Sequence, residues 1–220
     1  MKIVICGTGQ LEILELIDSI NKEKANQEKY QLIGFLDDNL DNYSRNLYGY
    51  KILGGFDWIS NYKNEVFVVN SIARSTKIRM KANLKLEKLG AKFINLIHPS
   101  VQLSHSKSIG TGNIIFENTA LKINSSIGNH NMILSGFVLG HDSQLGSYCF
   151  AGHNAICQGN VLINDCVFLA SGCNIAPSLR VNNFSTIGIG SVLLRDAAEG
   201  YTYIGNPAKG ILMNKNKLEK

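Results

Sequence analysis

Residues 133–151 read ILSGFVLGHDSQLGSYCFA, and within them an aliphatic side chain returns at every sixth position, at Ile133, Leu139 and Leu145. The same spacing extends in both directions, and fourteen of its sixteen positions are Ile, Leu or Val. The sixteen positions are Leu103, Ile109, Ile115, Leu121, Ile127, Ile133, Leu139, Leu145, Ala151, Cys157, Ile163, Leu169, Ile175, Val181, Ile187 and Leu193. A period of six fits neither an α-helix nor a single alternating strand, so it indicates a supersecondary repeat.

The residues between these positions indicate how the chain turns. Small side chains mostly stand four residues after each aliphatic, as at Ser125, Ser143 and Ala155, and glycine often follows it directly, as at Gly128 and Gly140. Short strands joined by sharp corners satisfy this pattern, and glycine is expected where a corner needs unusual backbone dihedrals. Three hexads close one coil of about 18 residues, and about five coils stack at roughly 4.8 Å because one coil cannot bury its own face. The sequence therefore predicts a parallel β-helix.

Composition and charge limit the classes of function. With 220 residues, 45% of them hydrophobic and 18% charged, the chain is expected to form one large or two small globular domains. Its net charge of +5 suits polyanionic small molecules such as nucleotide sugars and coenzyme A, but no basic run is dense enough to indicate nucleic acid. The lysines near the C-terminus are interpreted as a solvated tail. They are Lys209, Lys215, Lys217 and Lys220.

The cysteines and the apolar segments predict the compartment. The five cysteines form no CxxC pair, and their odd number argues against a disulfide framework. Cys149, Cys157 and Cys173 stand where the repeat needs a small apolar residue, so a reducing compartment is expected. Gly7 interrupts the first apolar run, and no stretch approaches the 18 or so apolar residues of a membrane span. We expect a cytoplasmic protein without a signal peptide or membrane contact.

The first 100 residues alternate between strand and helix patterns. Strands are expected at Lys2 to Cys6, Gln31 to Leu36, Val66 to Val69 and Lys92 to Ile94. Helices are expected from Gln10 to about Asn21, and from a cap at Ser75 or Thr76 through Leu89, with a loop from Asn39 to Gly55. The pattern predicts a small Rossmann-like α/β domain over residues 1–97 and the β-helix over residues 98–220. The linker between them is expected near Asn95 to Ser100, where His98-Pro99 marks it.

The glycine turn after the first strand departs from a dinucleotide fingerprint. Gly7-Thr8-Gly9 is followed by Glu12 where the third glycine of that fingerprint would stand, and a carboxylate there argues against NAD. The turn and the Asp37-Asp38 pair both lie at the carboxyl ends of strands, where ligands settle in open α/β sheets. Either this edge binds part of a nucleotide, or the two aspartates only form a turn. For a nucleotide-linked substrate the expected contacts are Gly9, Gln10, Asp37, Asp38 and Ser71.

The histidines of the repeat are His105, His130, His141 and His153. His141 stands two residues after the inward Leu139, so its side chain is expected to lean outward, and Asp142 follows it. Histidines on one face must be separated by a whole number of coils, and the intervals between the last three histidines do not satisfy this condition. His105 and His141 are two coils apart, roughly 9.6 Å, which is too far to share one ion. We therefore expect no metal site.

The string Gly140-His141-Asp142-Ser143-Gln144-Leu145-Gly146 resembles the His-Asp/Glu segment of the NeuD/PglD/PerB-type sugar acetyltransferases. Further matches are Leu36-Asp37-Asp38, Ala155-x-Cys157-x-Gly159-Asn160-Val161 and Gly205-Asn206-Pro207-Ala208-Lys209, so the resemblance spans the whole chain. It implies a Rossmann-like domain followed by a left-handed parallel β-helix of hexapeptide repeats. It also implies homotrimers with active sites between subunits.

The resemblance also implies a chemistry. His141 is the expected general base and Asp142 the carboxylate that raises its basicity. The expected reaction transfers acetyl from acetyl-CoA to an amino group of a nucleotide-linked deoxysugar, with the 4-amino group as the expected acceptor, without a covalent enzyme intermediate. Imidazole suits this role because it titrates near neutral pH. An O-acetyltransferase of a sialic-acid-like sugar and a non-catalytic nucleotide-sugar-binding scaffold stay open as alternatives.

By the same resemblance, acetyl-CoA, the cosubstrate, is expected to lie in the groove between neighbouring β-helices. Its expected contacts are Phe150, Gly159, Ser171, Ile189 and Pro207. Two positions depart from the family pattern. Some members have a histidine where this chain has Phe150, and many read Gly-x-Gly/Ser-Gly-His where this chain has Gly7-Thr8-Gly9-Gln10-Leu11.

Overall fold

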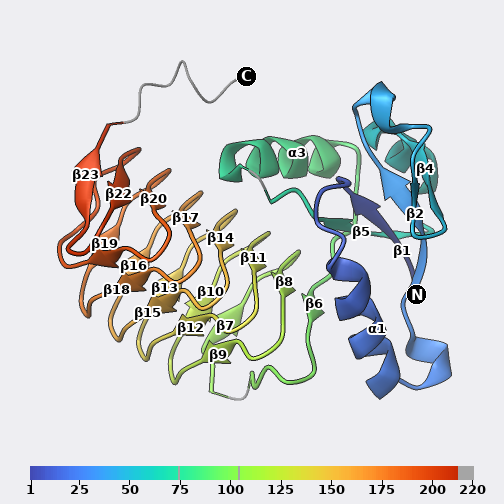
Figure 1. Cartoon of the computed structure of the whole chain (residues 1–220). Coiled ribbons are helices and arrows are strands. Elements are labelled where there is room, and N and C mark those ends of the chain that lie inside the picture. Colours follow the sequence, from blue (N-terminus) through green and yellow to red (C-terminus); the bar gives the residue numbers. More distant parts are fainter. Residues whose placement is uncertain (74, 104, 213–220) are drawn as a thin grey trace.

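The computed structural model describes residues 1–73, 75–103 and 105–212, and it contains an α/β sheet followed by a stack of short parallel strands. The chain starts in the sheet, and its coils run away from the sheet toward β23 (Lys209–Ile211) (Figure 1).

The α/β sheet has five strands in the order β3-β4-β2-β1-β5. They are β1 (Lys2–Cys6), β2 (Gln31–Leu36), β3 (Asn46–Leu47), β4 (Tyr50–Gly54) and β5 (Phe67–Asn70). Apart from β3, which is antiparallel to β4, neighbouring strands are parallel. The predicted strands at Lys2 to Cys6 and Gln31 to Leu36 are confirmed, and β5 begins one residue later than predicted.

Two helices cover opposite faces of this sheet. Ile3 and Ile5 of β1 pack in the cluster that contains α1 (Ile13–Glu23), whereas Val4 and Cys6 pack in the cluster that contains α3 (Thr76–Lys88). The split follows from the period of two in a strand, which sends alternate side chains to opposite faces. Ser75 caps α3 by accepting a hydrogen bond from the Ile78 amide at 3.4 Å, as its position predicts.

The stretch from Asn39 to Gly55 is not only a loop. It contains the β3-β4 hairpin, and its turn residues Tyr48 and Gly49 both have positive φ. The turn lacks the Asn-Gly or Asp-Gly signal of tight hairpins, which is why the sequence did not reveal it. The expected strand at Lys92 to Ile94 is reduced to one bridge between Val68 and Phe93. Short helices complete the domain: η1 (Asn26–Glu28), η2 (Leu40–Asn42), η3 (Phe56–Trp58) and α2 (Ile59–Tyr62).

The second part is a three-walled prism of short parallel strands. The first wall contains β7 (Ser108–Ile109), β10 (Ser126–Ile127), β13 (Gln144–Leu145), β16 (Leu162–Ile163) and β19 (Arg180–Val181). The second contains β6 (Leu96–Ile97), β8 (Ile114–Ile115), β11 (Met132–Ile133), β14 (Phe150–Ala151), β17 (Phe168–Leu169), β20 (Thr186–Ile187), β22 (Thr202–Ile204) and β23. The third contains β9 (Ala120–Leu121), β12 (Val138–Leu139), β15 (Ile156–Cys157), β18 (Asn174–Ile175) and β21 (Val192–Leu193). Within each wall, strands from successive coils pair in parallel, for example Ser126 with Gln144, which confirms the predicted coil of three hexads; β23 alone is antiparallel to its neighbour, β22.

The aliphatic residues that recur at every sixth position form the interior of the prism. From Leu121 onward these positions are at most 5% exposed, and the small residues four positions later, such as Ser143 and Ala155, are fully buried. Leu103 is 39% exposed, so the continuous prism begins after it.

The glycines that directly follow the inward aliphatics do not have the unusual backbone dihedrals that the sequence analysis expected. The glycines directly after the aliphatics, such as Gly140, have no positive φ, but a Cβ on Gly140 would lie 2.3 Å from the carbonyl carbon of Gln158 in the next coil. They are therefore needed for close approach of coils. The left-handed residues stand three after each aliphatic, with φ between 54° and 75°. They are Gly112, Asn118, Asn124, His130, Gly136, Asp142, Tyr148, Asn154, Asn160, Cys166, Gly172, Ser178, Phe184 and Gly190.

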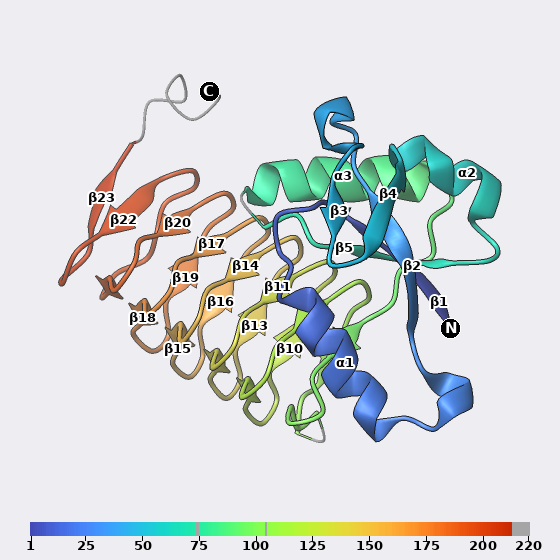
Figure 2. The same cartoon turned by 45° about the vertical axis from the view of Figure 1, so that its right-hand side comes forward.

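We number the corners by the walls that they join: the first corner joins walls one and two, the second joins two and three, and the third joins three and one. The α/β domain packs on the second wall and on the first corner. Met132 and Phe150, on the outer face of the second wall, share a cluster with Leu16 of α1. Along the first corner, Thr76 of α3 donates to the Cys166 carbonyl at 2.8 Å. Figure 2 shows α3 running along the stack.

All five cysteines are unpaired and buried, and for Cys149, Cys157 and Cys173 the burial was expected from their places in the repeat. Within the described residues, no helix combines the length and the apolar character needed to cross a membrane.

Candidate active site

The His141-Asp142 pair lies at the third corner, on the turn between β12 and β13. The backbone at Asp142 is left-handed, with φ of 58°, and its amide donates to the Ile123 carbonyl one coil earlier. The carboxylate lies 2.8 Å from His141 Nδ1 and accepts a second hydrogen bond from Asn124 Nδ2 at 3.1 Å. The coil register therefore holds the carboxylate in place for the imidazole.

The pair is open to solvent. The His141 side chain is 57% exposed and that of Asp142 is 47% exposed. The outward orientation predicted for His141 is thus confirmed, and its ring is not part of the prism interior.

The hydrogen bond fixes which imidazole nitrogen is free. The hydrogen bonds from His141 and Asn124 lower the pKa of the Asp142 carboxyl below its usual range. Asp142 is then a carboxylate that only accepts hydrogen bonds, so His141 Nδ1 carries the proton and Nε2 keeps its lone pair in the neutral ring. This is the arrangement that a general base requires.

Gly159 lies directly against that free nitrogen. It occupies the same corner position as His141 in the next coil, and a Cβ there would be 2.3 Å from His141 Nε2. Other coils place a side chain at this position, for example Ile123 and Pro177. The absence of a side chain at Gly159 makes room for the imidazole.

The other histidines lie elsewhere. His130 is buried at the first corner, where its Nε2 lies 3.1 Å from Glu87 Oε1, and His153 is half-buried at the second corner. Burial lowers the pKa of His130. The spacing thus places His130, His141 and His153 on three corners, as predicted. Over residues 1–73, 75–103 and 105–212, no three His, Cys, Asp or Glu side chains gather as a metal site would require.

The expected acetyl-CoA contacts fall into two groups. Gly159 is on the third corner beside His141, whereas Ser171 and Ile189 are on the second corner, in successive coils. Ile189 is 78% exposed. Phe150, on the second wall, is only 9% exposed and stacks on Phe168 with ring centroids 4.6 Å apart. Within one chain the two groups are therefore separated by the width of the third wall.

Pro207, the remaining expected contact, is exposed and lies between β22 and β23. These strands extend the second wall at the far end of the stack. Pro207 thus stands apart from the third corner that presents His141.

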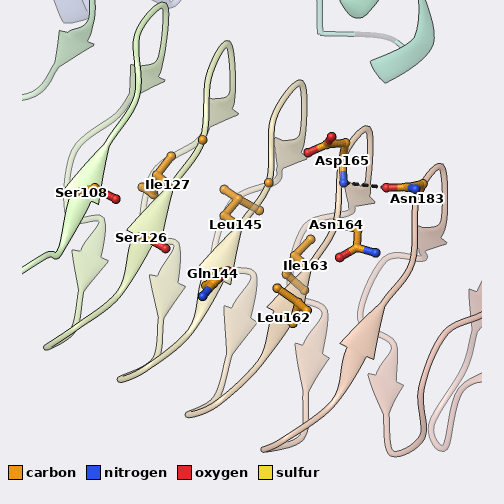
Figure 3. A pocket seen from close by; sticks show the side chains of 12 residues that line it. Ser108, Ser126, Ile127, Gln144, Leu145, Leu162, Ile163, Asn164, Asp165 and Asn183 are labelled. Carbon is orange, nitrogen blue, oxygen red and sulfur yellow. Dashed lines mark hydrogen bonds between the residues drawn. The ribbon is translucent and has the colours of Figure 1, made fainter.

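The first wall carries an open groove of about 370 Å³, which extends onto the first corner at Asn164, Asp165 and Asn183. Figure 3 shows the outward side chains Ser108, Ser126, Gln144 and Leu162 along it. The strand β13, which lines the groove, follows directly after Ser143 of the His141 turn. The sequence analysis missed this groove, although these outward residues immediately precede the inward aliphatics in the repeat.

The predicted nucleotide contacts meet at one edge of the α/β sheet. Gly9 and Gln10 follow β1, Asp37 and Asp38 follow β2, and Ser71 follows β5. The order of the parallel strands brings these ends together, as expected.

Most of these polar groups are used within the protein. Asp37 accepts hydrogen bonds from Thr8 Oγ1 at 2.9 Å and from Asn42 Nδ2 at 2.8 Å. Asp38 accepts the Phe56 amide at 2.8 Å and pairs with Lys85 at 3.0 Å. Both aspartates therefore hold the loops around this edge.

Ser71 is also engaged within the protein. It is buried, with its hydroxyl 3.0 Å from the carbonyl oxygens of both Cys6 and Gly7. Ser71 therefore fastens the turn after β1 to the end of β5.

A residue that the sequence analysis missed stands at the same edge. Arg45 Nη1 lies 3.2 Å from Asn42 Oδ1 and 3.4 Å from Thr8 Oγ1. Its position inside a loop of Asn and Tyr gave no motif by which to find it.

These features define a class of protein: an α/β domain packed on a hexapeptide-repeat parallel β-helix that presents a histidine-carboxylate pair at an exposed corner. No protein-family model matches the chain.

Solved structures give a more particular comparison. PerB from Caulobacter crescentus, in complex with CoA and GDP-perosamine, is 23% identical over 96% of this chain and 97% of its own, with a TM-score of 0.83. WeeI from Acinetobacter baumannii AYE is 25% identical over 96% and 100%, with a TM-score of 0.81. The acetyltransferase domain of PglB from Neisseria gonorrhoeae FA1090, in complex with acetyl coenzyme A, is 22% identical over 96% and 98%, with a TM-score of 0.77. At these identities the likeness shows a shared fold along the whole chain.

The resemblance drawn from the sequence is thereby confirmed at the level of architecture. The parallel stack and these neighbours fit a left-handed β-helix, as expected.

Proposed function

We propose that this protein is an acetyl-CoA-dependent N-acetyltransferase acting on an amino group, the 4-amino group, of a nucleotide-linked deoxysugar. One observation supports this most strongly: the exposed side chain of His141 bonds to Asp142 through Nδ1 at 2.8 Å, which leaves Nε2 free to accept a proton. Proteins of the same fold in complex with CoA and GDP-perosamine support the choice of substrates.

The proposed reaction is direct transfer. The neutral amine attacks the thioester carbonyl, so the C–N bond forms as the C–S bond breaks. His141 Nε2 takes the proton that the amine nitrogen loses and passes it to the departing thiolate of CoA. Asp142 stabilises the imidazolium between these steps, and general-base help of this kind typically accelerates a reaction by about 10²- to 10⁴-fold.

In this proposal each domain binds one of the two substrates. Residues 1–97 form a Rossmann-like domain that binds the nucleotide at the edge formed by Gly9, Gln10, Asp37, Asp38 and Ser71. Residues 98–220 hold acetyl-CoA against Gly159, Ser171, Ile189 and Pro207, whereas Phe150, the fifth expected contact, is 9% exposed on the wall that the α/β domain covers. The lysines at 215, 217 and 220 of the expected solvated tail lie outside the described residues. The five unpaired cysteines fit a reducing cytoplasm.

The protein acts as a homotrimer with shared sites. The second wall is covered by the α/β domain. The outer face of the third wall is covered by no other part of the described chain, and it is apolar except at Asn174, since its other outward residues are Ala120, Val138, Ile156 and Val192. The third wall is bordered by the second and third corners. Three prisms that turn their third walls toward a threefold axis therefore place the third corner of one copy beside the second corner of the next.

This arrangement accounts for the separation of the expected contacts. His141 and Gly159 of one copy would face Ser171 and Ile189 of its neighbour, so that the acetyl-CoA groove is complete only in the assembly. Light scattering tests the trimer, and a monomer with full activity would contradict the shared site.

Replacing His141 with Ala tests the function. The assay measures free CoA release with purified nucleotide amino sugars and with sialic-acid-like acceptors. An N-acetyltransferase loses most turnover while binding of both substrates persists. Turnover only with hydroxyl acceptors would favour O-acetylation, and binding without turnover in the unaltered protein would favour a scaffold.

A further inference from the structure

The helix terminus that usually receives a nucleotide diphosphate is occupied by a carboxylate in this protein. Glu12 stands at the N-cap of α1, and its Oε2 accepts a hydrogen bond from Gln10 Nε2 at 2.6 Å. The positive end of a helix dipole attracts anions, but a fixed negative charge there repels a phosphate. A diphosphate at this edge needs another source of positive charge.

Arg45 is a cation placed to supply that charge. It lies in the loop after β2, and Nη1 reaches across to Thr8 in the turn after β1. Over residues 1–73, 75–103 and 105–212, no Asp or Glu forms a salt bridge with it. Its side chain is exposed, so its remaining guanidinium donors are open to a ligand.

A network anchored on Asp37 orients the guanidinium. Asp37 Oδ2 accepts hydrogen bonds from both Thr8 and Asn42, and the oxygens of these two side chains in turn face Arg45 Nη1. The three loops of the edge are thus tied together behind the cation. This arrangement gives Asp37 a positioning role and explains why its carboxylate is already occupied.

The turn next to Arg45 has room for a ligand. A Cβ on Gly9 would meet nothing within 4 Å. In the described part of the chain, the amides of Gly9 and Gln10 have no acceptor within the protein. Backbone amides beside a guanidinium are a common combination of donors for phosphate oxygens.

We infer that Arg45, together with the amides of Gly9 and Gln10, binds the diphosphate of the nucleotide-linked substrate. This inference rests on the proposed function for its choice of ligand class. It assigns the diphosphate to the side of the turn that faces the β2 loop, away from Glu12. A purely structural Arg45 would instead serve only to hold Thr8 and Asn42.

The experiment measures binding of nucleoside diphosphates alone, so that it does not depend on acetyl transfer. Isothermal titration with GDP, UDP and dTDP compares the unaltered protein with Arg45→Ala, Arg45→Lys and Glu12→Gln. Lys51→Ala is the matched control, because it removes an exposed positive charge from the nearby β4 without touching the network. Titration of the corresponding nucleosides reports contacts that do not involve phosphate.

Arg45→Ala is expected to weaken diphosphate binding at least about 10-fold, since charge-assisted hydrogen bonds are the ones lost. Arg45→Lys should recover part of that loss, Glu12→Gln should tighten binding, and Lys51→Ala should leave it unchanged. Nucleoside binding should not respond to Arg45. Raising the salt concentration should weaken diphosphate binding to the unaltered protein more than to Arg45→Ala, because exposed charges are screened.

The inference is overturned if Arg45→Ala binds diphosphates as the unaltered protein does, or if its loss is equal for nucleosides. It is also overturned if the unaltered protein binds none of the three diphosphates. Failure of the proposed function has a different signature: intact, Arg45-dependent diphosphate binding with no acetyl transfer to any amino sugar.

Discussion

Substituting Ala for Gly159 is a sharp test of where the proton transfer takes place. The new Cβ would lie 2.3 Å from His141 Nε2, 2.6 Å from Cε1 and 2.9 Å from Cδ2. Ordinary van der Waals contact begins at about 3.4 Å, so the imidazole must move by about 1 Å or rotate away from Asp142. Gly159 has no positive φ, and other coils place Ile or His at this position, so the backbone accepts Ala without strain.

The expected consequence is a fall in kcat of about 100-fold, which is the loss typical of a misplacement of about 1 Å at a reacting centre. The thermal unfolding midpoint should change little, because the imidazole is exposed and can yield. Steady-state CoA release gives kcat and KM, and circular dichroism monitors the fold. Thr111→Ala, at the same hexad position on the first corner, is the control and should keep full activity.

Normal turnover in Gly159→Ala would refute the reasoning, since an imidazole displaced by a new side chain could not perform the transfer at its present position. Loss of the fold would also contradict it, because the argument requires that only the ring and its bond to Asp142 respond.

Three further predictions follow from the same contacts. Asp142→Asn should lower kcat about 10-fold or more, because the carboxylate that orients the His141 ring and keeps the proton on Nδ1 is lost. The KM for acetyl-CoA should stay near its original value. Ile156→Glu, which puts a charge on the third wall, should convert the proposed trimer to monomers by light scattering, with the circular dichroism spectrum retained. Burial lowers the pKa of His130, so its contribution to stability is present above the usual histidine pKa and is lost as pH falls through the folded value. His130→Asn, which removes that titration and suits the left-handed backbone, should flatten the fall in unfolding temperature between pH 7.5 and 5.5; an unchanged slope would contradict this.

The prism could be predicted from the sequence because its signal is repeated. Each inward aliphatic, such as Leu139, is one instance of a pattern that recurs every six residues, and an error at one position, as at Leu103, does not alter the period. The hairpin around Tyr48-Gly49 could not be predicted in this way. It occurs once, and Tyr in a left-handed turn is contrary to the propensity on which such predictions rest.

Packing against the α/β domain explains one of the unusual residue types at the first corner, His130. At this corner the left-handed positions include His130, Tyr148, Cys166 and Phe184, where other corners mostly use Asn, Asp or Gly. A left-handed conformation costs roughly 1–2 kcal/mol for a residue with a Cβ. Contacts with the α/β domain offset this cost, because Glu87 bonds to the His130 ring and Arg79 Nε donates to the His130 carbonyl at 2.6 Å.

The site was partly predictable for the same reason as the prism. His141 has a fixed place in the six-residue repeat. Its outward orientation follows from its position two residues after Leu139, and its separation from His130 and His153 follows from the sequence intervals between the three histidines. The sequence analysis names Gly159 only as an acetyl-CoA contact. Its closeness to His141 could have been found too, since it follows His141 by one full coil, but only by comparing equivalent positions of successive coils for a missing side chain.

At the edge of the α/β sheet where the nucleotide contacts are predicted, no repeat like that of the prism guides the prediction. The sequence predicts Asp37 as a substrate contact or a turn residue because it lies at the carboxyl end of a strand, and here Asp37 Oδ2 already accepts hydrogen bonds from Thr8 and Asn42. Whether a polar group at such an edge is free depends on how the loops fold over it. The free donors belong to Arg45, whose place beside the turn depends on a long-range contact with Thr8, far away in the sequence, that no local pattern encodes. At this edge, we therefore propose ligand contacts from the unsatisfied donors and acceptors rather than from the type of residue.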